Sequence, residues 1–264
     1  MIYAGIDIGS LTAKAAIIKK DPGTGEISLL GTKVMRAGYD PEKAGKEILA
    51  ALLGQTGTDR GRITGIVATG YGRNAVEGAD KPMSEIICHG AGAHFFHPGV
   101  RGVIDVGGQD CKAISLNSRG QVADFAMNDK CAAGTGRFFE VMAETMELDI
   151  DQLGPLGLTA DNPAKISSIC TVFAESEVIS LIAARQSRPN IIAGILESAS
   201  LRVASLASRA NLSSPVMMTG GGAKNTGLVK ILEKCLGYGI IVNKFPQENG
   251  AVGAAVLAAG LNRV

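Results

Sequence analysis

The feature that most constrains the fold of this chain is an internal repeat. Residues 5–18, GIDIGSLTAKAAII, align without a gap with residues 103–116, VIDVGGQDCKAISL. In each copy an apolar run ends at an Asp, a glycine turn follows, and a second apolar run contains a Lys seven residues after the Asp. Apolar runs of this length separated by a Gly-containing turn are typical of a β-hairpin. The repeat therefore predicts two strand–turn–strand hairpins, each followed by helical sequence.

The two predicted turns have the chemistry of a nucleotide-phosphate site. Clustered backbone N–H groups in a tight turn form a concave surface that binds anions. Asp7 and Asp105 end the first strand of each copy. Either can orient Mg²⁺ through water, because Mg²⁺ keeps several waters and takes only one or two carboxylates. Two such hairpins facing each other would hold the phosphates of one nucleotide from both sides. Two ordinary hairpins with small turn residues are the alternative.

A third glycine cluster strengthens the nucleotide interpretation. Gly220, Gly221 and Gly222 follow the apolar run VMMT and precede a helical stretch. Three consecutive glycines are unfavourable inside a strand or a helix, so they mark a special backbone requirement. Close approach of the backbone to a flat ligand such as adenosine is one such requirement, and a plain strand-to-helix turn is the other.

The two Asp–x–Gly hairpins and the late triple-glycine turn resemble, in this order, the fold shared by actin, the sugar kinases and the ATP-hydrolysing heat-shock chaperones. The resemblance implies an α/β protein of two related ribonuclease-H-like domains with a nucleotide cleft between them. Residues 82–93 resemble the helix that joins the halves. Residues 247–258 resemble a second such helix, whose small residues would let the two helices pass closely. The expected domains are 1–96 plus 247–264, and 97–246.

Two of the five cysteines lie at predicted helix starts. Cys170, in SSICTVFAESEVIS, begins a helix that runs to about Arg185, with Ser167 or Ser168 as its cap. Cys131, in NDKCAAGTGRF, precedes a helix with one mostly apolar face at i, i+3, i+4, i+7 and i+8. That face consists of Phe138, Val141, Met142, Thr145 and Met146. Free N–H groups at a helix start favour anionic sulfur.

Two thiolates in such positions are compatible with several kinds of chemistry. An intrachain disulfide, a redox pair, a zinc site and half of an iron–sulfur cluster are all open, and so is burial of both cysteines as small side chains. Zinc sites and cubane clusters commonly take four ligands of this kind. A two-fold dimer presents the same two cysteines twice and would complete the set.

Five segments carry a second, more specific resemblance: NDKCAAGTGRF, SSICTVFAESEVIS, ATGYGRN, MSEIICH and VIDVGGQD. They resemble the ATP-dependent activators of 2-hydroxyacyl-CoA dehydratases and benzoyl-CoA reductases, and the resemblance covers essentially the whole chain. It implies an ATP-hydrolysing one-electron donor in which a [4Fe–4S] cluster bridges a homodimer, held by Cys131 and Cys170 of both subunits.

The same resemblance implies ATP, ADP and Mg²⁺ as ligands and a ferredoxin or flavodoxin as electron donor. The acceptor would be an iron–sulfur enzyme, and a 2-hydroxyacyl-CoA dehydratase, an aryl-CoA reductase and a double-cubane cluster protein stay open. A small-metabolite kinase and a non-catalytic scaffold of the same fold are the rival functions.

The expected site residues follow from these motifs. Catalytic roles are expected for Asp105, Gln109 and Glu85, of which Glu85 stands where the chaperones carry a water-orienting Glu. The residue that orients the attacking water stays open among them. The residues expected to bind ATP, its phosphates or Mg²⁺ are Asp7, Gly9, Ser10, Leu11, Thr12, Lys14, Gly107, Gly108, Gln109, Asp110, Gly134, Gly220, Gly221, Gly222 and Asn225.

Charge composition and the N-terminal sequence narrow the remaining classes of function. Lys and Arg number 26 against 25 Asp and Glu, which argues against a nucleic-acid or membrane-surface protein driven by bulk charge. The N-terminus reads directly as a strand rather than as a signal peptide, so we expect a cytoplasmic protein. We expect His89, His94 and His97 to serve packing rather than metal binding. Buried, small side chains are expected at Cys88, Cys111 and Cys235.

Overall fold

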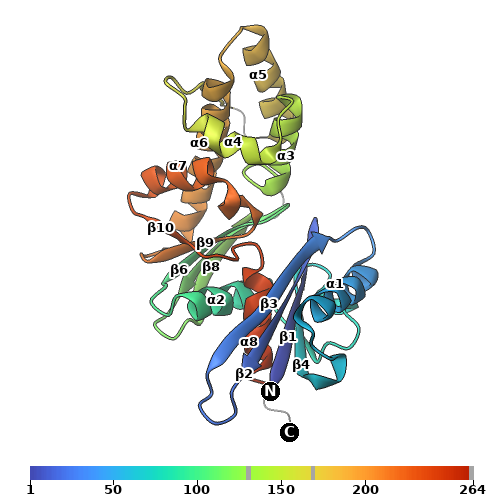
Figure 1. Ribbon diagram of the computed structural model, residues 1–264. Coiled ribbons are helices and arrows are strands. Elements are labelled where there is room, and N and C mark those ends of the chain that lie inside the picture. The colour runs from blue at the N-terminus through green and yellow to red at the C-terminus, as the bar shows by residue number, and fades with distance from the viewer. Residues whose placement is uncertain (129–131, 168–169, 262–264) are drawn as a thin grey trace. The chain divides into compact units, whose positions relative to one another are not determined.

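The computed structural model describes residues 1–128, 132–167 and 170–261 (Figure 1). The contacts between residues divide the chain into two compact units. Unit 1 comprises Met1–Val100, Leu116–Ala123 and Asn243–Val264, and unit 2 comprises Arg101–Ser115 and Asp124–Val242. The domain boundaries expected from the sequence stay a prediction, because a division of contacts does not test which segments fold independently.

The sheet of unit 1 is built around the first copy of the repeat. Its strand order is β3-β2-β1-β4-β5, and β1 pairs antiparallel with β2 and parallel with β4. The strands are β1 (Ile2–Ile8), β2 (Thr12–Lys20), β3 (Ile27–Arg36), β4 (Ile63–Thr69) and β5 (Lys81–Pro82). Every residue of the central strand β1 is buried, which matches its continuous apolar run.

A second sheet repeats this plan with the second copy. Its strand order is β8-β7-β6-β9-β10, so the chain enters both sheets in the same order. The strands are β6 (Gly102–Val106), β7 (Cys111–Leu116), β8 (Val122–Asn128), β9 (Val216–Thr219) and β10 (Ile240–Val242). In register, Asp7 pairs with Lys14 and Asp105 pairs with Lys112. The two predicted hairpins are therefore confirmed, down to the cross-strand Asp–Lys pair.

Helices cover both faces of the unit 1 sheet. They are α1 (Pro41–Thr56), α2 (Glu85–Phe96) and α8 (Asn249–Ala258). Ile48 and Leu52 of α1 pack in a cluster with one face of the sheet, whereas α8 packs against the opposite face. The start of α1 is fixed locally, because the Asp40 side chain accepts hydrogen bonds from two backbone N–H groups of the first turn.

Helices α2 and α8 pass each other through glycines. A Cβ added at Gly253 would lie 1.8 Å from the backbone oxygen of Cys88, and one at Gly92 would lie 2.2 Å from that of Asn249. Any side chain at these positions would force the helices apart. The predicted close passage of these two helices is confirmed within unit 1.

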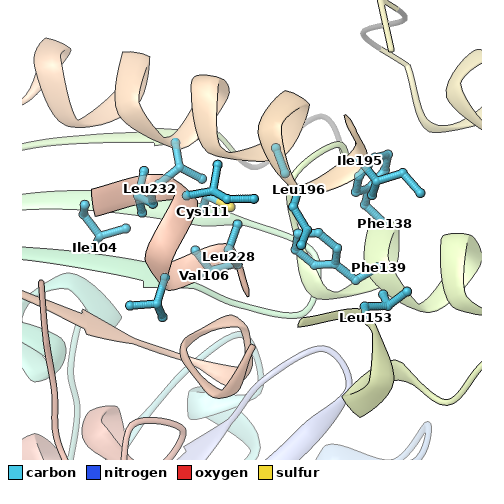
Figure 2. Close-up of a cluster of buried hydrophobic side chains, with 14 of the residues drawn as sticks. Ile104, Val106, Cys111, Phe138, Phe139, Leu153, Ile195, Leu196, Leu228 and Leu232 are labelled. Atoms are coloured by element: carbon cyan, nitrogen blue, oxygen red, sulfur yellow. The ribbon is translucent and has the colours of Figure 1, made fainter. Parts of the chain in front are cut away.

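Among the described residues of unit 2, five helices contribute buried side chains to its core. Phe138 and Phe139 of α3 (Gly136–Thr145) pack in one cluster with Ile104 and Val106 of β6. Figure 2 shows these side chains together with Leu196 of α6 (Arg188–Arg209). The helices are α3 (Gly136–Thr145), α4 (Ile150–Gly157), α5 (Thr171–Ala183), α6 (Arg188–Arg209) and α7 (Thr226–Leu236).

Helix α6 is long and apolar enough to cross a membrane by length and composition alone. Most of its apolar window is nevertheless buried inside unit 2, and residues such as Ile195 and Leu196 lie in the core cluster. Its composition is therefore that of a central core helix.

Two local predictions are wrong. Cys235 is exposed rather than buried, because it lies in the last turn of α7, beyond Leu232, the last buried residue of that helix. Ser167 does not cap α5: Cys170 itself is the residue before the helix, and the hydroxyl of Ser167 donates to the Glu177 carboxylate at 2.9 Å. Ser168 lies outside the described residues.

Candidate nucleotide-binding and cysteine sites

The hairpin turn of unit 1 brings a buried carboxylate to a lysine. Asp7 ends β1 and is 1% exposed, and its Oδ2 lies 3.3 Å from Lys14 Nζ. The N–H of Gly9 donates to the Thr12 carbonyl at 3.0 Å and closes the turn. A Cβ at Gly9 would lie 2.8 Å from Lys14 Nζ, so the glycine leaves room for the amine. Ser10 and Leu11, in the same turn, are partly exposed.

The second oxygen of Asp7 is an unsatisfied acceptor. Asp7 Oδ1 is buried and has no hydrogen-bond partner among the described residues. It lies close to Gly70, where φ is +85° and an added Cβ would be 2.5 Å from it. Buried polar atoms are normally paired, so an orphan at this position points to an ordered water or ion. A hydrated Mg²⁺ fits this donor set.

Helix α2 adds two more titratable side chains near the same carboxylate. His89 is buried, and its Nε2 lies 3.9 Å from Glu85 Oε1. A Cβ at Gly250 would be 3.0 Å from His89 Nε2 and 3.1 Å from Asp7 Oδ2, so the imidazole and the carboxylate flank this glycine. His89, expected to serve packing, thus lies close to the Asp7 carboxylate of the predicted nucleotide site.

In the hairpin turn of unit 2, the lysine is paired with two carboxylates, against one in the turn of unit 1. Lys112 Nζ is buried and lies 2.8 Å from Asp110 Oδ2 and 3.4 Å from Asp105 Oδ2. The N–H of Gly107 donates to the Asp110 carbonyl at 2.9 Å, as in the first turn. Thr219, at the end of β9, donates its hydroxyl to Asp105 Oδ1 at 2.9 Å. Both carboxylates of this turn thus have partners within unit 2.

The two lysines of the repeat therefore differ in availability. The position of Asp110 in the second turn is occupied by Thr12 in the first, so Lys14 has one carboxylate partner where Lys112 has two. The side chain of Lys14 is 13% exposed against 2% for Lys112. The amine of Lys14 therefore has less negative charge around it than the amine of Lys112, which is held between two carboxylates of its own hairpin.

The sequence comparison missed part of the repeat. In each unit a parallel strand ends in Thr–Gly beside the Asp: Thr69–Gly70 after β4 and Thr219–Gly220 after β9. Gly220 has a φ of +82°, and an added Cβ would lie 2.8 Å from Asp105 Oδ1. The corresponding sequence signal is ATG at 68–70 and MTG at 218–220, which lies outside both hairpins.

The other predicted nucleotide contacts lie on unit 2 turns. Gly108 is partly exposed and Gln109 is exposed at the tip of the second turn, and Gly221 is exposed after β9. Gly222 is buried against Val106. Asn225 caps α7, and its Oδ1 accepts from the Leu228 N–H at 2.9 Å. The cap gives Asn225 a structural role beside any contact with a ligand.

The phosphate turn of unit 2 is bonded to the start of α3. The N–H groups of Gly136 and Arg137 donate to the carbonyls of Gly107 and Gly108, both at 2.8 Å. Just before this helix, Gly134 has a φ of +84°, and its carbonyl accepts from the buried Cys111 thiol at 3.3 Å. The turn and the loop that follows residue 131 are therefore joined by backbone hydrogen bonds.

Of the two predicted cluster ligands, one can be placed. Cys170 is exposed at the start of α5, and Val172 and Phe173 beside it are 64% and 67% exposed. Cys131 lies outside the described residues. Among the cysteines that the structure describes, Cys88 and Cys111 are buried and Cys170 and Cys235 are exposed.

Known proteins resemble the whole chain. The activator of lactoyl-CoA dehydratase from Anaerotignum propionicum is 46% identical over 98% of this chain and 97% of its own length. The (R)-2-hydroxyglutaryl-CoA dehydratase activating ATPase of Acidaminococcus fermentans is 44% identical over 96% of this chain and 95% of its own. The structure of the activator of the 2-hydroxyisocaproyl-CoA dehydratase from Clostridium difficile, with bound ADPNP, superposes with a TM-score of 0.90 at 39% identity, covering 100% of this chain and 99% of that one.

These similarities agree with the architecture of the two units. The predicted fold class, two related α/β units of the actin-like ATPase type, is confirmed. The model of the BadF/BadG/BcrA/BcrD ATPase family matches residues 4–258. The chain, with its two Asp–Lys hairpins and its exposed Cys170, belongs to the BadF/BadG/BcrA/BcrD ATPase family.

Proposed function

We propose that this protein is an ATP-hydrolysing activator that donates single electrons to an iron–sulfur 2-hydroxyacyl-CoA dehydratase. An aryl-CoA reductase and a double-cubane cluster protein are the alternative acceptors. The names of the relatives support the dehydratase. The observation that carries the proposal is Cys170, an exposed thiol at a helix start with exposed apolar neighbours, in the same unit as a phosphate-type turn.

ATP and Mg²⁺ are proposed to contact both hairpin turns and the triple-glycine turn. Lys14 neutralises phosphate charge, because its amine has a single carboxylate partner in its own unit. Asp7 would hold a water of Mg²⁺ through Oδ1, the oxygen without a hydrogen-bond partner in the described part of the chain. Backbone N–H groups within residues 10–12 and 108–110, beyond the two glycine N–H groups that close the turns, would supply the remaining donors.

Hydrolysis needs a group that orients the attacking water. Glu85, at the first position of α2, Asp105, at the end of β6, and Gln109, at the tip of the second turn, are the proposed catalytic side chains. Gln109 is exposed and uncharged, so it can position a water without holding a charge. The Oε1 of Glu85 lies 3.9 Å from Nε2 of the buried His89 imidazole.

In the same proposal, Cys131 and Cys170 of two copies hold one [4Fe–4S] cluster, which supplies one-electron chemistry at low potential when bound. Cys170 fits this donor set because its side chain is accessible. Exposed Val172 and Phe173 give an apolar surface for a second copy to cover, which supports a homodimer. Two cysteines from each copy complete four ligands.

The contacts of unit 2 supply a route from nucleotide to cysteines. The carbonyls of Gly107 and Gly108 are hydrogen-bonded to the start of α3. Thr145, in the last turn of that helix, donates to Glu175 of α5 at 3.4 Å. A nucleotide-dependent shift of the turn would thus reach both helices through bonded neighbours.

A ferredoxin or flavodoxin in the cytoplasm would provide the electron.

Anaerobic purification tests the cluster assignment. The expected product is a brown dimer that bleaches with dithionite and carries about four irons, as the count of four thiolates requires. Cys170→Ala should remove the iron and leave ATP binding intact. Cys235→Ala, which removes the other exposed described cysteine, should keep the iron. Full iron content in Cys170→Ala would refute the ligand assignment, and a phosphorylated metabolite with no iron would favour the kinase alternative.

Lys14→Ala tests the phosphate site. Loss of a charge-assisted hydrogen bond to phosphate costs about 1.5–3 kcal/mol, which is about 10- to 150-fold in ATP affinity. Lys43→Ala removes an exposed lysine of α1 and is the matched control. Fluorescent-nucleotide titration and phosphate release measure both. Unchanged ATP affinity and turnover in Lys14→Ala would overturn this assignment without touching the cluster.

A further inference from the structure

A groove in unit 1 lies away from the Asp7 carboxylate. It has a volume of about 730 Å³, within the range of small-molecule sites. Its walls come from α2, from α8 and from the turn between β7 and β8, all of which belong to unit 1. The floor is apolar and consists of Ile87, Ala91, Phe95, Val256 and Leu257.

The rim of this groove is basic. Its polar side chains are His94, Arg119 and Gln121, and no carboxylate lines it. Nδ1 of His94 is buried and has no hydrogen-bond partner among the described residues. The backbone N–H of Arg119 donates to Asn117 Oδ1 at 2.9 Å, so the turn is fixed while the exposed guanidinium can serve a ligand.

A glycine holds the turn against the helix. At Gly120 φ is +73°, and an added Cβ would lie 2.2 Å from Cγ of His94. The imidazole therefore packs directly on the turn backbone, and no larger residue fits at position 120. The basic rim is in this way fixed over an apolar floor, the arrangement that an amphipathic anion needs.

We propose that this groove binds a small amphipathic carboxylate. The apolar chain lies on the floor formed by α2 and α8, and the carboxylate pairs with Arg119 at the rim. A cation of the same shape would meet Arg119 without a compensating carboxylate, and a neutral molecule would leave the guanidinium unused. The site is independent of the proposed ATPase function, because it uses none of the residues assigned to nucleotide or cluster.

Isothermal titration with octanoate tests this site directly. Each buried methylene is worth about fourfold in affinity, so octanoate should bind about 15-fold more tightly than hexanoate. Octylamine, of the same length and opposite charge, should not bind. Equal binding of octanoate and octylamine, or no octanoate binding at millimolar concentration, would overturn the proposal.

Two variants locate the binding. Arg119→Gln should weaken octanoate about fivefold at low salt, the effect of one exposed ion pair, and Arg62→Gln, the same change at another exposed position, should not. Ala91→Leu fills the floor and should abolish binding with an unchanged circular dichroism spectrum. Octanoate that binds both Arg119→Gln and Ala91→Leu as tightly as the parent protein would place it elsewhere and refute the proposal.

Discussion

Substituting Gly253 by Ala should destabilise the protein at the contact of α2 with α8. The new Cβ would lie 1.8 Å from the carbonyl oxygen of Cys88 and 2.7 Å from the N–H nitrogen of Gly92. Ordinary carbon contacts begin near 3.4 Å, so the helices must separate by about 1.5 Å. Both obstacles are backbone atoms, so no side-chain rotation relieves the clash. Overpacking of this kind costs about 1–3 kcal/mol or more.

The matched control is the same change in another helix. Gly54 lies in α1, and an added Cβ would meet nothing within 4 Å, so Gly54→Ala should stabilise by about 0.5–1 kcal/mol. Urea unfolding followed by circular dichroism measures both variants. Opposite signs are expected, with Gly253→Ala about 2 kcal/mol or more below the parent. Equal stabilities for Gly253→Ala and Gly54→Ala would refute the close passage of the helices.

Two further predictions concern buried charge and buried sulfur. Lys112→Met should cost about 3–5 kcal/mol of unfolding free energy in urea, because it removes the cation that pairs with two buried aspartates; a loss below about 1 kcal/mol would contradict this. Burial raises the pKa of the Cys88 thiol to about 12, so its thiolate stays scarce up to pH 9. In a cluster-free Cys131→Ala variant, a thiol-reactive dye at pH 8 should label Cys170 and Cys235 and spare Cys88 until the protein is unfolded. Rapid labelling of Cys88 in the native protein would be the contrary result.

The hairpins were predictable because their information is local. An apolar run, a terminal Asp, a glycine turn and a second run specify a hairpin within 14 residues, and the second copy supplies an independent check. The Thr–Gly ends of β4 and β9 were not found, because they reach their Asp only through parallel pairing across long connections. Tertiary pairing of that kind leaves a signal of two residues in the sequence.

The cysteines show the same division between local and tertiary information. The prediction that Cys170 lies at a helix start is confirmed, although Ser167, one of its two predicted caps, does not cap the helix. Exposure is not local: Cys111 and Cys235 each follow a charged residue, Asp110 and Lys234, yet Cys111 is buried in the core cluster and Cys235 is exposed near a helix end. Burial depends on what packs against the element.

The unequal turns of the repeat fit unequal tasks in the proposed function. In unit 1 the turn retains an available lysine and an unpaired carboxylate oxygen, the features needed to bind phosphate and hydrated Mg²⁺. In unit 2 the extra Asp110 neutralises Lys112, and the turn carbonyls are hydrogen-bonded to the start of α3. Because Lys112 is already paired with two carboxylates, the turn of unit 2 would attract phosphate only weakly through this lysine. The same turn is hydrogen-bonded to Gly136 and Arg137, at the start of α3. Among the positions at which the two copies differ, Thr12 in the first and Asp110 in the second account for the second carboxylate that lies beside Lys112.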